Sequence, residues 1–285
     1  MKKTQSFKIR DKETVLITGA SSGIGLHLAK ECARHGHPLV LVAPVESELQ
    51  QVAFVLTSAH PVKVRTIAKD LCQPDAAKEI LEQLAGAPVD ILINNAGHGK
   101  KGKFWEIPLE DDLSMLHLNI EAVVRLTKAF LPAMVERNRG RILNTASVAG
   151  FEPGPGYVVY SSTKAFVLSF SEALATELQG THVTVTALCP GPTDTDFYRK
   201  ADMMETRAFQ QANLMAPQEV AKAAYEGLMA GNRLVVPGFG NKALVFLRRL
   251  IPESMAAKLN EIMITDVLPD QQKRRRGDKE LSYKE

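Results

Sequence analysis

A serine, a tyrosine and a lysine stand in a fixed order within residues 144–170. Tyr160 and Lys164 are four residues apart, so in a helix beginning near Val158 they share one face, and the ammonium would lower the pKa of the phenol. Ser147 follows an apolar stretch and could hydrogen-bond the substrate oxygen that the tyrosine protonates. These residues predict a group that delivers a proton to an alkoxide.

Tyr157 is a second candidate for this acid, three residues earlier. The residue four positions after it is Ser161 and not a lysine, so we assign the acid to Tyr160. The spacing of tyrosine and lysine also occurs by chance in helices, so its value as evidence for a catalytic site depends on the motifs around it. The residues between the serine and the tyrosine, FEPGPGYVV, are expected to form part of a substrate wall, where Phe151 and His98 would touch substrate or serve in packing.

Three glycines form a G-x-x-x-G-x-G motif between an apolar run, 14–18, and a helical pattern, 24–35. Glycine lets the backbone approach a pyrophosphate, and the N-terminus of the following helix supplies amides and the positive end of its dipole. A tight turn without a ligand is the alternative reading. The residues predicted to bind a dinucleotide here are Gly19, Ser21, Ser22, Gly23, Ile24 and Gly25.

The second predicted strand ends where dinucleotide-binding folds distinguish NAD from NADP. Ala43, Pro44 and Val45 occupy this place, so the acid that binds a ribose 2′-hydroxyl is missing, and so is the arginine that often binds a 2′-phosphate. Glu46 could reach the ribose, or it could serve the dipole of its own helix. The missing acid favours NADP(H) over NAD(H).

Short apolar runs alternate with helical patterns along the chain. We predict strands at 14–18, 38–43, 62–68, 89–93, 141–146, 183–188 and 233–236. We predict helices at 24–35, 46–59, 74–84, 157–178 and 217–230, and a short helix followed by a long one, starting near Asn119, within 109–137. This alternation predicts an α/β fold: a doubly wound, Rossmann-like parallel sheet of about seven strands in a three-layer sandwich.

The chain divides by pattern into four parts. We expect a polar N-terminal segment (1–13), a catalytic domain (14–240), amphipathic C-terminal helices broken by Pro252 (241–270) and a disordered basic tail (271–285). Residues 194–215 lack regular periodicity but carry several Phe, Tyr and Met side chains. They predict a mobile lid over an apolar substrate, or side chains that simply pack on the domain.

Composition is that of a globular protein with a large core: 45% of the 285 residues are hydrophobic and 24% are charged. The net charge of +3 is small and predicts no nucleic-acid partner. Three separated cysteines, no secretory h-region and no apolar run long enough to span a membrane predict a cytoplasmic protein. Histidines show no ligand pairing, so we expect no metal, and membrane contact through the C-terminal helices stays open.

Several motifs together resemble the short-chain dehydrogenase/reductase family from about Thr14 to Pro237. They are TGASSGIG (18–25), NNAG (94–97), Asn119, the Ser147, Tyr160 and Lys164 set, and PGPTDT (190–195). The resemblance implies that Asn119 bends a helix and holds a water in a proton relay, and that Lys164 also binds the nicotinamide ribose. Further cofactor contacts implied in this way are Asp70, Leu71, Asn95, Ala96, Gly97, Tyr160, Pro190, Gly191, Thr193 and Thr195, although cap and turn roles remain open for several of them.

The function expected from these residues is hydride transfer between a nicotinamide and a carbonyl or secondary alcohol, with reduction of an apolar ketone or aldehyde favoured. One alternative is a 3-oxoacyl thioester reductase of lipid metabolism. Another, of a different class, is a dinucleotide-binding sensor without turnover, which has no physical need for Ser147, Tyr160, Lys164 and Asn119 together. The long predicted helices near 119–137 and 157–178 resemble those through which the family pairs, so we expect a homo-oligomer, a dimer or tetramer.

Overall fold

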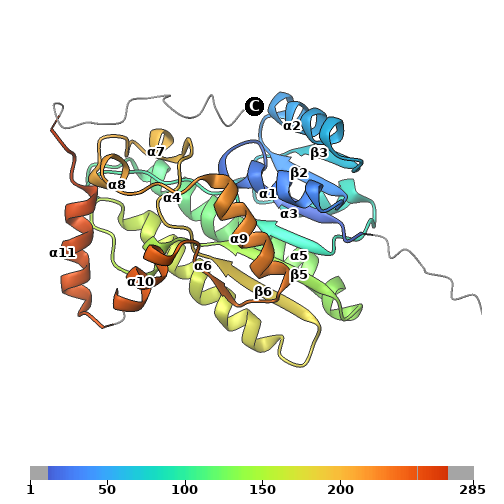
Figure 1. Ribbon diagram of the computed structural model, residues 1–285. Coiled ribbons are helices and arrows are strands. Elements are labelled where there is room, and N and C mark those ends of the chain that lie inside the picture. Colours follow the sequence, from blue (N-terminus) through green and yellow to red (C-terminus); the bar gives the residue numbers. More distant parts are fainter. Residues whose placement is uncertain (1–11, 249, 269–285) are drawn as a thin grey trace, which may run out of the picture.

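The computed structural model describes residues 12–248 and 250–268. Its centre is a parallel sheet of seven strands in the order β3-β2-β1-β4-β5-β6-β7 (Figure 1). The strands are β1 (Val15–Thr18), β2 (Leu39–Ala43), β3 (Val64–Ala68), β4 (Ile91–Asn94), β5 (Gly140–Thr145), β6 (Val183–Leu188) and β7 (Leu234–Val235). The predicted doubly wound fold is confirmed, and the predicted strand ends agree with the structure to within two residues, with 183–188 matched at both ends.

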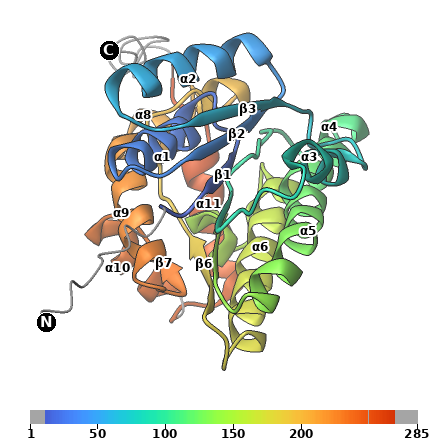
Figure 2. The same ribbon diagram turned by 90° about the vertical axis from the view of Figure 1, so that its right-hand side faces the viewer.

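Helices cover both faces of the sheet, as Figure 2 shows. α1 (Gly23–Arg34), α2 (Glu46–Ala59) and α9 (Pro217–Met229) pack on one face. α3 (Ala76–Leu84), α5 (Ala122–Glu136) and α6 (Val158–Glu177) cover the other. Because both faces are covered, the inner strands β1, β2 and β4 are apolar along nearly their whole length, and every one of their residues is buried.

Strand order reverses beside β1, since β2 lies on one side of it and β4 on the other. In open parallel sheets a ligand crevice forms at such a switch point, outside the carboxyl ends of the strands. The glycine motif follows β1, Asn95 follows β4 and Ser147 follows β5, so all three reach the same edge of the sheet. The sheet topology therefore determines where a functional site can form.

The helical segment 109–136 corrects one prediction. A short helix followed by a separate one near Asn119 was expected, but α4 (Leu109–Leu116) continues without a break through a π-helical turn, η1 (His117–Glu121), into α5. The residues at both junctions keep right-handed helical dihedrals. The wider turn leaves Asn119 inward, with only 1% of its surface exposed, and π-turns of this kind are frequent at functional sites.

Residues 194–215 contain two short helices, α7 (Phe197–Lys200) and α8 (Arg207–Gln210). The segment leaves and re-enters the domain at one point, because the Asp194 amide donates to the carbonyl of Met215 over 2.9 Å. At its far side it is tied to residues 265–267: the Arg207 amide donates to the carbonyl of Thr265 (3.1 Å), and the Val267 amide donates to that of Glu205 (2.9 Å).

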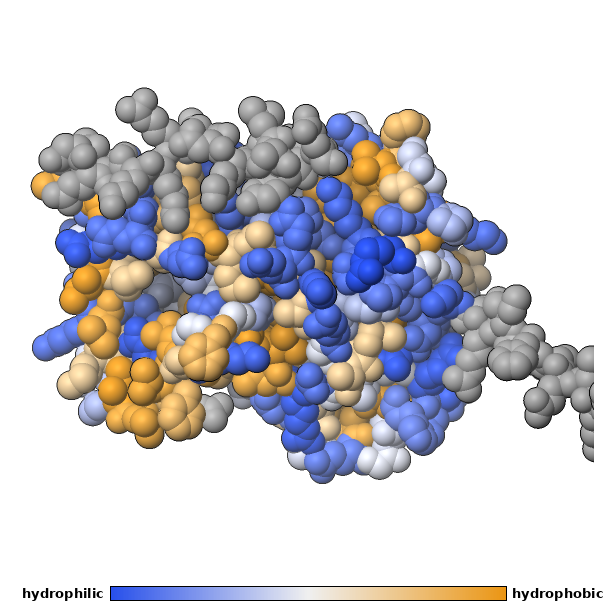
Figure 3. Space-filling model, in the orientation of Figure 1, coloured by the Kyte–Doolittle hydropathy of each residue, from blue (hydrophilic) through white to orange (hydrophobic). Residues whose placement is uncertain are grey.

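The C-terminal region forms α10 (Phe239–Arg248) and α11 (Glu253–Ile264), separated at Pro252 as expected. Apolar side chains gather over these two helices on the face seen in Figure 3. No helix in the described ranges has the length and apolar character needed to cross a bilayer. The predicted tail, 271–285, and most of the N-terminal segment, 1–11, lie outside the described residues.

Candidate active site

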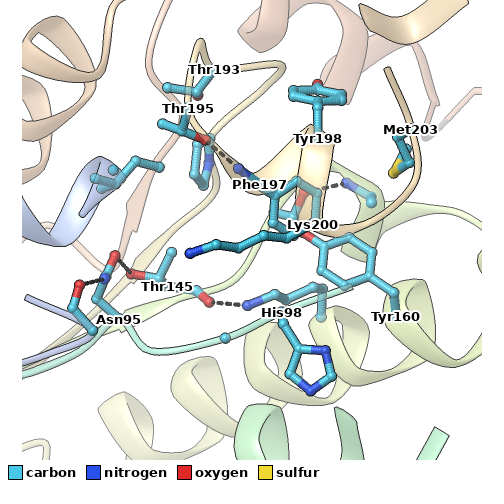
Figure 4. Close-up of a pocket in the computed structure, with 18 of the residues that line it drawn as sticks. Asn95, His98, Thr145, Tyr160, Thr193, Thr195, Phe197, Tyr198, Lys200 and Met203 are labelled. Carbon is cyan, nitrogen blue, oxygen red and sulfur yellow. Dashed lines mark hydrogen bonds between the residues drawn. The ribbon is translucent and has the colours of Figure 1, made fainter. Parts of the chain in front are cut away.

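A pocket of about 800 Å³ lies at the carboxyl edge of the sheet and extends to α10 and α11. In Figure 4, Thr193 and Thr195 lie across this pocket from Asn95 and Thr145. The structure brings most of the predicted cofactor residues into its wall: Gly19, Ser21, Ser22, Gly23, Ile24, Asp70, Leu71, Asn95, Ala96, Gly97, Tyr160, Lys164, Pro190, Gly191, Thr193 and Thr195. Gly25 and Asn119 are predicted residues that do not line it.

The glycine turn has the properties that a pyrophosphate requires. α1 begins at Gly23 without a side-chain cap from Ser22 and without an acidic residue in its first turn, so its first amides are available to an anion. Gly19 and Gly23 adopt positive φ angles of 63° and 53°, which glycine accepts most readily. A Cβ on Gly25 would overlap the carbonyl oxygen of Gly19. Gly25 thus serves close packing of helix and turn, and the turn fits a dinucleotide.

Asn95 and Thr18 hold this turn against β4. The hydroxyl of Thr18 accepts hydrogen bonds from the amides of Asn95 (2.9 Å) and Ala96 (3.0 Å). The side-chain amide of Asn95 donates to the carbonyl of Thr18 over 3.1 Å. The NNAG motif therefore has a clear positioning role for the cofactor turn, whatever further contact its residues make.

Ser147, Tyr160 and Lys164 meet in the same pocket, at its centre. β5 and the short helix η2 (Val148–Phe151) place Ser147, whose hydroxyl accepts a hydrogen bond from the Ala149 amide over 3.1 Å. α6 carries the other two residues, with Lys164 Nζ 5.8 Å from the centre of the Tyr160 ring. The ammonium donates to the carbonyl of Thr145 over 2.8 Å, which fixes it beneath the tyrosine.

Burial dominates the protonation of both groups. It raises the pKa of Tyr160 to about 12, while a hydrogen bond with Ser147 acts in the opposite direction. It lowers the pKa of Lys164 to about 8. The expectation that Lys164 lowers the tyrosine pKa is not met in this structure, because the ammonium is directed at the Thr145 carbonyl and desolvation of the phenolate raises that pKa. Tyr160 is therefore a stable proton donor.

Asn119 lies behind the site and organises it. Its side-chain amide donates to the carbonyl of His98 (2.9 Å) and to the hydroxyl of Thr163 (3.0 Å), and its oxygen accepts from the His98 amide (3.1 Å). Little room is left for a side chain at Gly97, since a Cβ there would lie 3.0 Å from the Asn119 oxygen and 3.3 Å from Lys164 Nζ. The π-turn thus links the helix, the strand-end motif and α6.

The outer part of the pocket is mainly apolar. The centres of the Phe197 and Tyr160 rings lie 5.3 Å apart, and both residues are labelled in Figure 4. Other apolar lining residues come from the segment 194–215 and from α10 and α11: Tyr198, Met203, Ala208, Leu244, Leu259, Ile262, Met263 and Ile264. Tyr157 also lines this part of the pocket, 6% exposed, and burial raises the pKa of its phenol.

Two features of the wall were not predicted. The guanidinium of Arg248 pairs with Glu152 at 2.6 Å, and both side chains are almost fully buried. Lys69, at the end of β3, lines the opposite end of the pocket. Neither residue belongs to a local motif, because each reaches the site only through the packing of distant elements. The acidic residue in FEPGPGYVV was the available signal for Glu152.

Comparison with known proteins identifies the family. Residues 13–206 match the model for the short chain dehydrogenase family, and the chain belongs to this family. The human very-long-chain 3-oxoacyl-CoA reductase is 37% identical over 182 residues, which are 62% of this chain and 58% of that protein. The chain therefore aligns with less than two thirds of that relative's length.

Two solved structures extend the comparison over most of the chain. A short-chain dehydrogenase from Sphingobium yanoikuyae in complex with NADPH is 35% identical, with a TM-score of 0.75, and the match covers 83% of this chain and 94% of that one. The bulky-bulky ketone specific alcohol dehydrogenase from Comamonas testosteroni is 31% identical, with a TM-score of 0.72, and covers 87% and 98% respectively. The solved structures and the family model therefore point to the same family and the same fold.

Proposed function

We propose that this protein is an NAD(P)(H)-dependent oxidoreductase that reduces an apolar ketone or aldehyde, or oxidises the corresponding alcohol. The observation that carries the proposal is the meeting of Ser147, Tyr160 and Lys164 in one pocket with the glycine turn at one end and an apolar wall at the other. Family membership supports it. The proposal assigns residues 14–240 to the catalytic domain and residues 194–215 to its lid.

The nicotinamide cofactor would supply or accept the hydride. Tyr160 donates its proton to the substrate oxygen as negative charge develops there, and Ser147 holds that oxygen by a hydrogen bond. Lys164 contributes positive charge below this pair. Asn119 positions the strand-end motif and α6, and it is assigned to the proton relay. A wall of Phe, Tyr, Met, Leu and Ile side chains excludes water around the reacting carbon.

NADP(H) is the preferred cofactor in this proposal. No acidic side chain stands at Ala43, Pro44 or Val45 to bind a ribose 2′-hydroxyl. Glu46, the nearest acid, is hydrogen-bonded to Gln50 and Thr66. Asp70 accepts the Cys72 amide over 2.9 Å, a local turn that sets the chain beside the adenine position.

The substrate pocket favours a bulky apolar carbonyl compound. Phe197 lies beside Tyr160, while Tyr198, Met203 and Phe209 pack together in the same apolar cluster. Since both ends of the segment are joined at Asp194 and Met215, the intervening residues can move as a lid without disturbing the sheet. The structure of the bulky-ketone alcohol dehydrogenase, 31% identical, supports this substrate class.

The test is NADPH oxidation across a panel of carbonyl compounds. Each methylene buried by the pocket contributes about 0.8 kcal/mol, so kcat/KM should rise several-fold per carbon along a series of ketones or aldehydes until the pocket is full. The panel includes small sugars as polar controls, and small polyols are tested in the reverse direction, as hydride donors to NADP⁺. A flat series, or a preference for the polar compounds, contradicts the proposed substrate class.

A 3-oxoacyl thioester is the second candidate substrate. It is favoured by the relative named very-long-chain 3-oxoacyl-CoA reductase, at 37% identity, and by an apolar wall long enough to involve α10 and α11. Including 3-oxoacyl thioesters of increasing chain length in the same panel separates the two candidates. A sensor without turnover would bind NADPH but oxidise it with no member of the panel.

The proposal also includes a homo-oligomer in the cytoplasm. α6 exposes Val158 and Phe166, and the rings of Phe166 and Phe170 stack with centroids 5.9 Å apart. A flat apolar strip of this kind on a long helix suits a two-fold helix pairing. The exposed apolar side chains of α10 and α11 offer a second contact region or a surface for membrane lipids.

A further inference from the structure

If NADP(H) binds in the pocket, the residues that follow β2 at the adenosine end offer no positive charge to its 2′-phosphate. Ala43, Pro44 and Val45 line this end and carry no charge. Glu48 also lines it and adds a negative charge. A 2′-phosphate is an anion that dinucleotide-binding proteins normally accommodate with a basic side chain near this strand end. The required cation must therefore come from another element.

Lys69 lies directly beside this strand end. β2 and β3 pair in parallel with Ala43 opposite Ala68, and the Lys69 amide donates to the carbonyl of Ala43 over 2.9 Å. The lysine is thus the next residue along the neighbouring strand. Adjacent parallel strands lie about 4.8 Å apart, a distance that a lysine side chain easily spans.

The side chain of Lys69 also points to the appropriate face. Val42 and Ile67 are buried in the same core cluster, on the side covered by α3. Since side chains alternate along a strand, residues 44 and 69 follow on that same side. Lys69 pairs with Glu79 of α3, which packs on this face. Pro44 occupies the matching position on β2 without a charge to offer.

Other basic side chains of the pocket wall lie elsewhere. Lys164 is held at Thr145, beneath the catalytic tyrosine. Lys200 belongs to α7 and pairs with Asp196 at 3.4 Å, and Arg248 belongs to α10 and pairs with Glu152. Among the Lys and Arg side chains that line the pocket in the described ranges, Lys69 is the one at the adenosine end.

We propose that Lys69 binds the 2′-phosphate of NADP(H) and sets the cofactor preference, exchanging its ion pair with Glu79 for the phosphate. The Glu79 side chain is 43% exposed and that of Lys69 21%, and pairs as open to solvent as this contribute little to stability. The exchange therefore costs little, and Glu79 keeps the lysine in place until the cofactor arrives. This inference rests on the proposed NADP(H) dependence.

The test compares nucleotide binding in variants without requiring turnover. Dissociation constants for NADPH and NADH are measured by fluorescence titration, and those for adenosine 2′,5′-bisphosphate and 5′-AMP by calorimetry. Lys69→Gln should weaken NADPH and the bisphosphate by about 10- to 100-fold, the range for losing a hydrogen bond to a charged group. NADH and 5′-AMP should change less than about twofold, because they lack the phosphate that the lysine contacts.

Two further variants sharpen the result. Lys63→Ala removes an exposed lysine that precedes β3 at the opposite end of the strand, and it should leave all four constants unchanged. Glu79→Gln frees Lys69 from its partner and should tighten NADPH binding without affecting NADH. Unchanged NADH binding in Lys69→Gln also shows that the variant is folded.

The outcomes separate this inference from the proposed function. If Lys69→Gln keeps the wild-type ratio of NADPH to NADH affinity while NADPH remains preferred, the assignment of Lys69 is wrong and the cofactor preference stands. If NADPH binds through Lys69 but no carbonyl compound is reduced, the lysine assignment stands and the proposed activity is wrong. If the wild-type protein binds NADH more tightly than NADPH, the lysine assignment and the NADP(H) preference are both overturned, while the proposed oxidoreductase activity stands.

Discussion

In the proposed reaction Tyr160 keeps its proton until it passes to a substrate oxygen, and burial of the phenol favours this protonated state. A pKa of about 12 means that the phenol is fully protonated in the free protein at neutral pH. The Ser147 side chain is hydrogen-bonded to the Tyr160 phenol, and this hydrogen bond stabilises the phenolate charge. The site in this state is therefore prepared for reduction, in which the tyrosine gives up a proton.

Replacing Tyr160 with Phe should abolish reduction and leave cofactor binding almost intact. Only the hydroxyl is removed, and general acids typically contribute about 10²- to 10⁴-fold to rate. The measurement is kcat with the best substrate of the panel, together with NADPH binding by fluorescence. Tyr157→Phe is the matched control, because that phenol lies in the same pocket; if it is the variant that loses activity, the acid has been assigned to the wrong tyrosine.

The pKa of Lys164 predicts how the rate of the reaction depends on pH. Burial lowers the pKa of this ammonium to about 8, so the positive charge is present below that pH and is lost above it. Tyr160 remains protonated across the same interval. We therefore expect kcat/KM for reduction to be level near pH 7 and to fall as pH rises through about 8, measured at saturating NADPH. Activity that stays constant to pH 10 would show that the charge of Lys164 is not required.

At the scale of elements, the glycine turn and α1 form one rigid unit. Gly25 is buried against the carbonyl of Gly19 and the side chain of Asn95. Asn95 in turn is bonded to Thr18. The turn proposed to receive the pyrophosphate is therefore shaped by β1, β4 and α1 together.

Gly25→Ala should damage both stability and cofactor binding. The added methyl group would overlap backbone, and overpacking of this kind costs about 1–3 kcal/mol. Gly240→Ala in α10 is the control, since a Cβ there meets nothing within 4 Å and alanine is favoured in a helix by up to about 1 kcal/mol. Thermal unfolding and NADPH titration check both. Equal behaviour of the two variants would contradict the role given to Gly25.

The sequence predicted the sheet and the catalytic constellation because both leave local marks. Buried parallel strands such as 15–18 and 91–94 are apolar runs, and Tyr160 with Lys164 has a recognisable spacing. The π-turn at Asn119 leaves no such mark, since its residues also suit an α-helix. Lys69 and Arg248 could not be identified in advance, because their roles depend on which strand lies beside β2 and on how α10 folds back over the pocket.

At the scale of the whole molecule, the exposed apolar surface predicts assembly. Phe166 of α6 is 39% exposed and stacks on Phe170. Several apolar side chains of α10 and α11 are more exposed than Phe166. Monomeric proteins rarely leave extended patches of this kind uncovered. Pairing through α6 would bury the stacked phenylalanines at the two-fold axis.

Phe166→Asp should therefore dissociate the oligomer. A charge within the helix pairing would be buried without a partner, and sedimentation velocity at micromolar concentration would show a shift to the mass of a single chain. Phe54→Asp, on the exposed side of α2, is the control and should leave the mass unchanged. A wild-type protein that sediments as a single chain refutes the expected assembly.

The hydrogen bonds between residues 205–207 and 265–267 would make the segment after α11 a latch for the proposed lid. The Arg207 and Val267 amides each donate across this junction, so neither can be exposed to solvent without parting the two segments. Their deuterium exchange should then follow one common opening rate, and exchange of Arg207 much faster than that of Val267 would show that the segments separate independently. If the two segments separate together, a bulky molecule can enter or leave the pocket only when the residues at the end of α11 separate from residues 205–207.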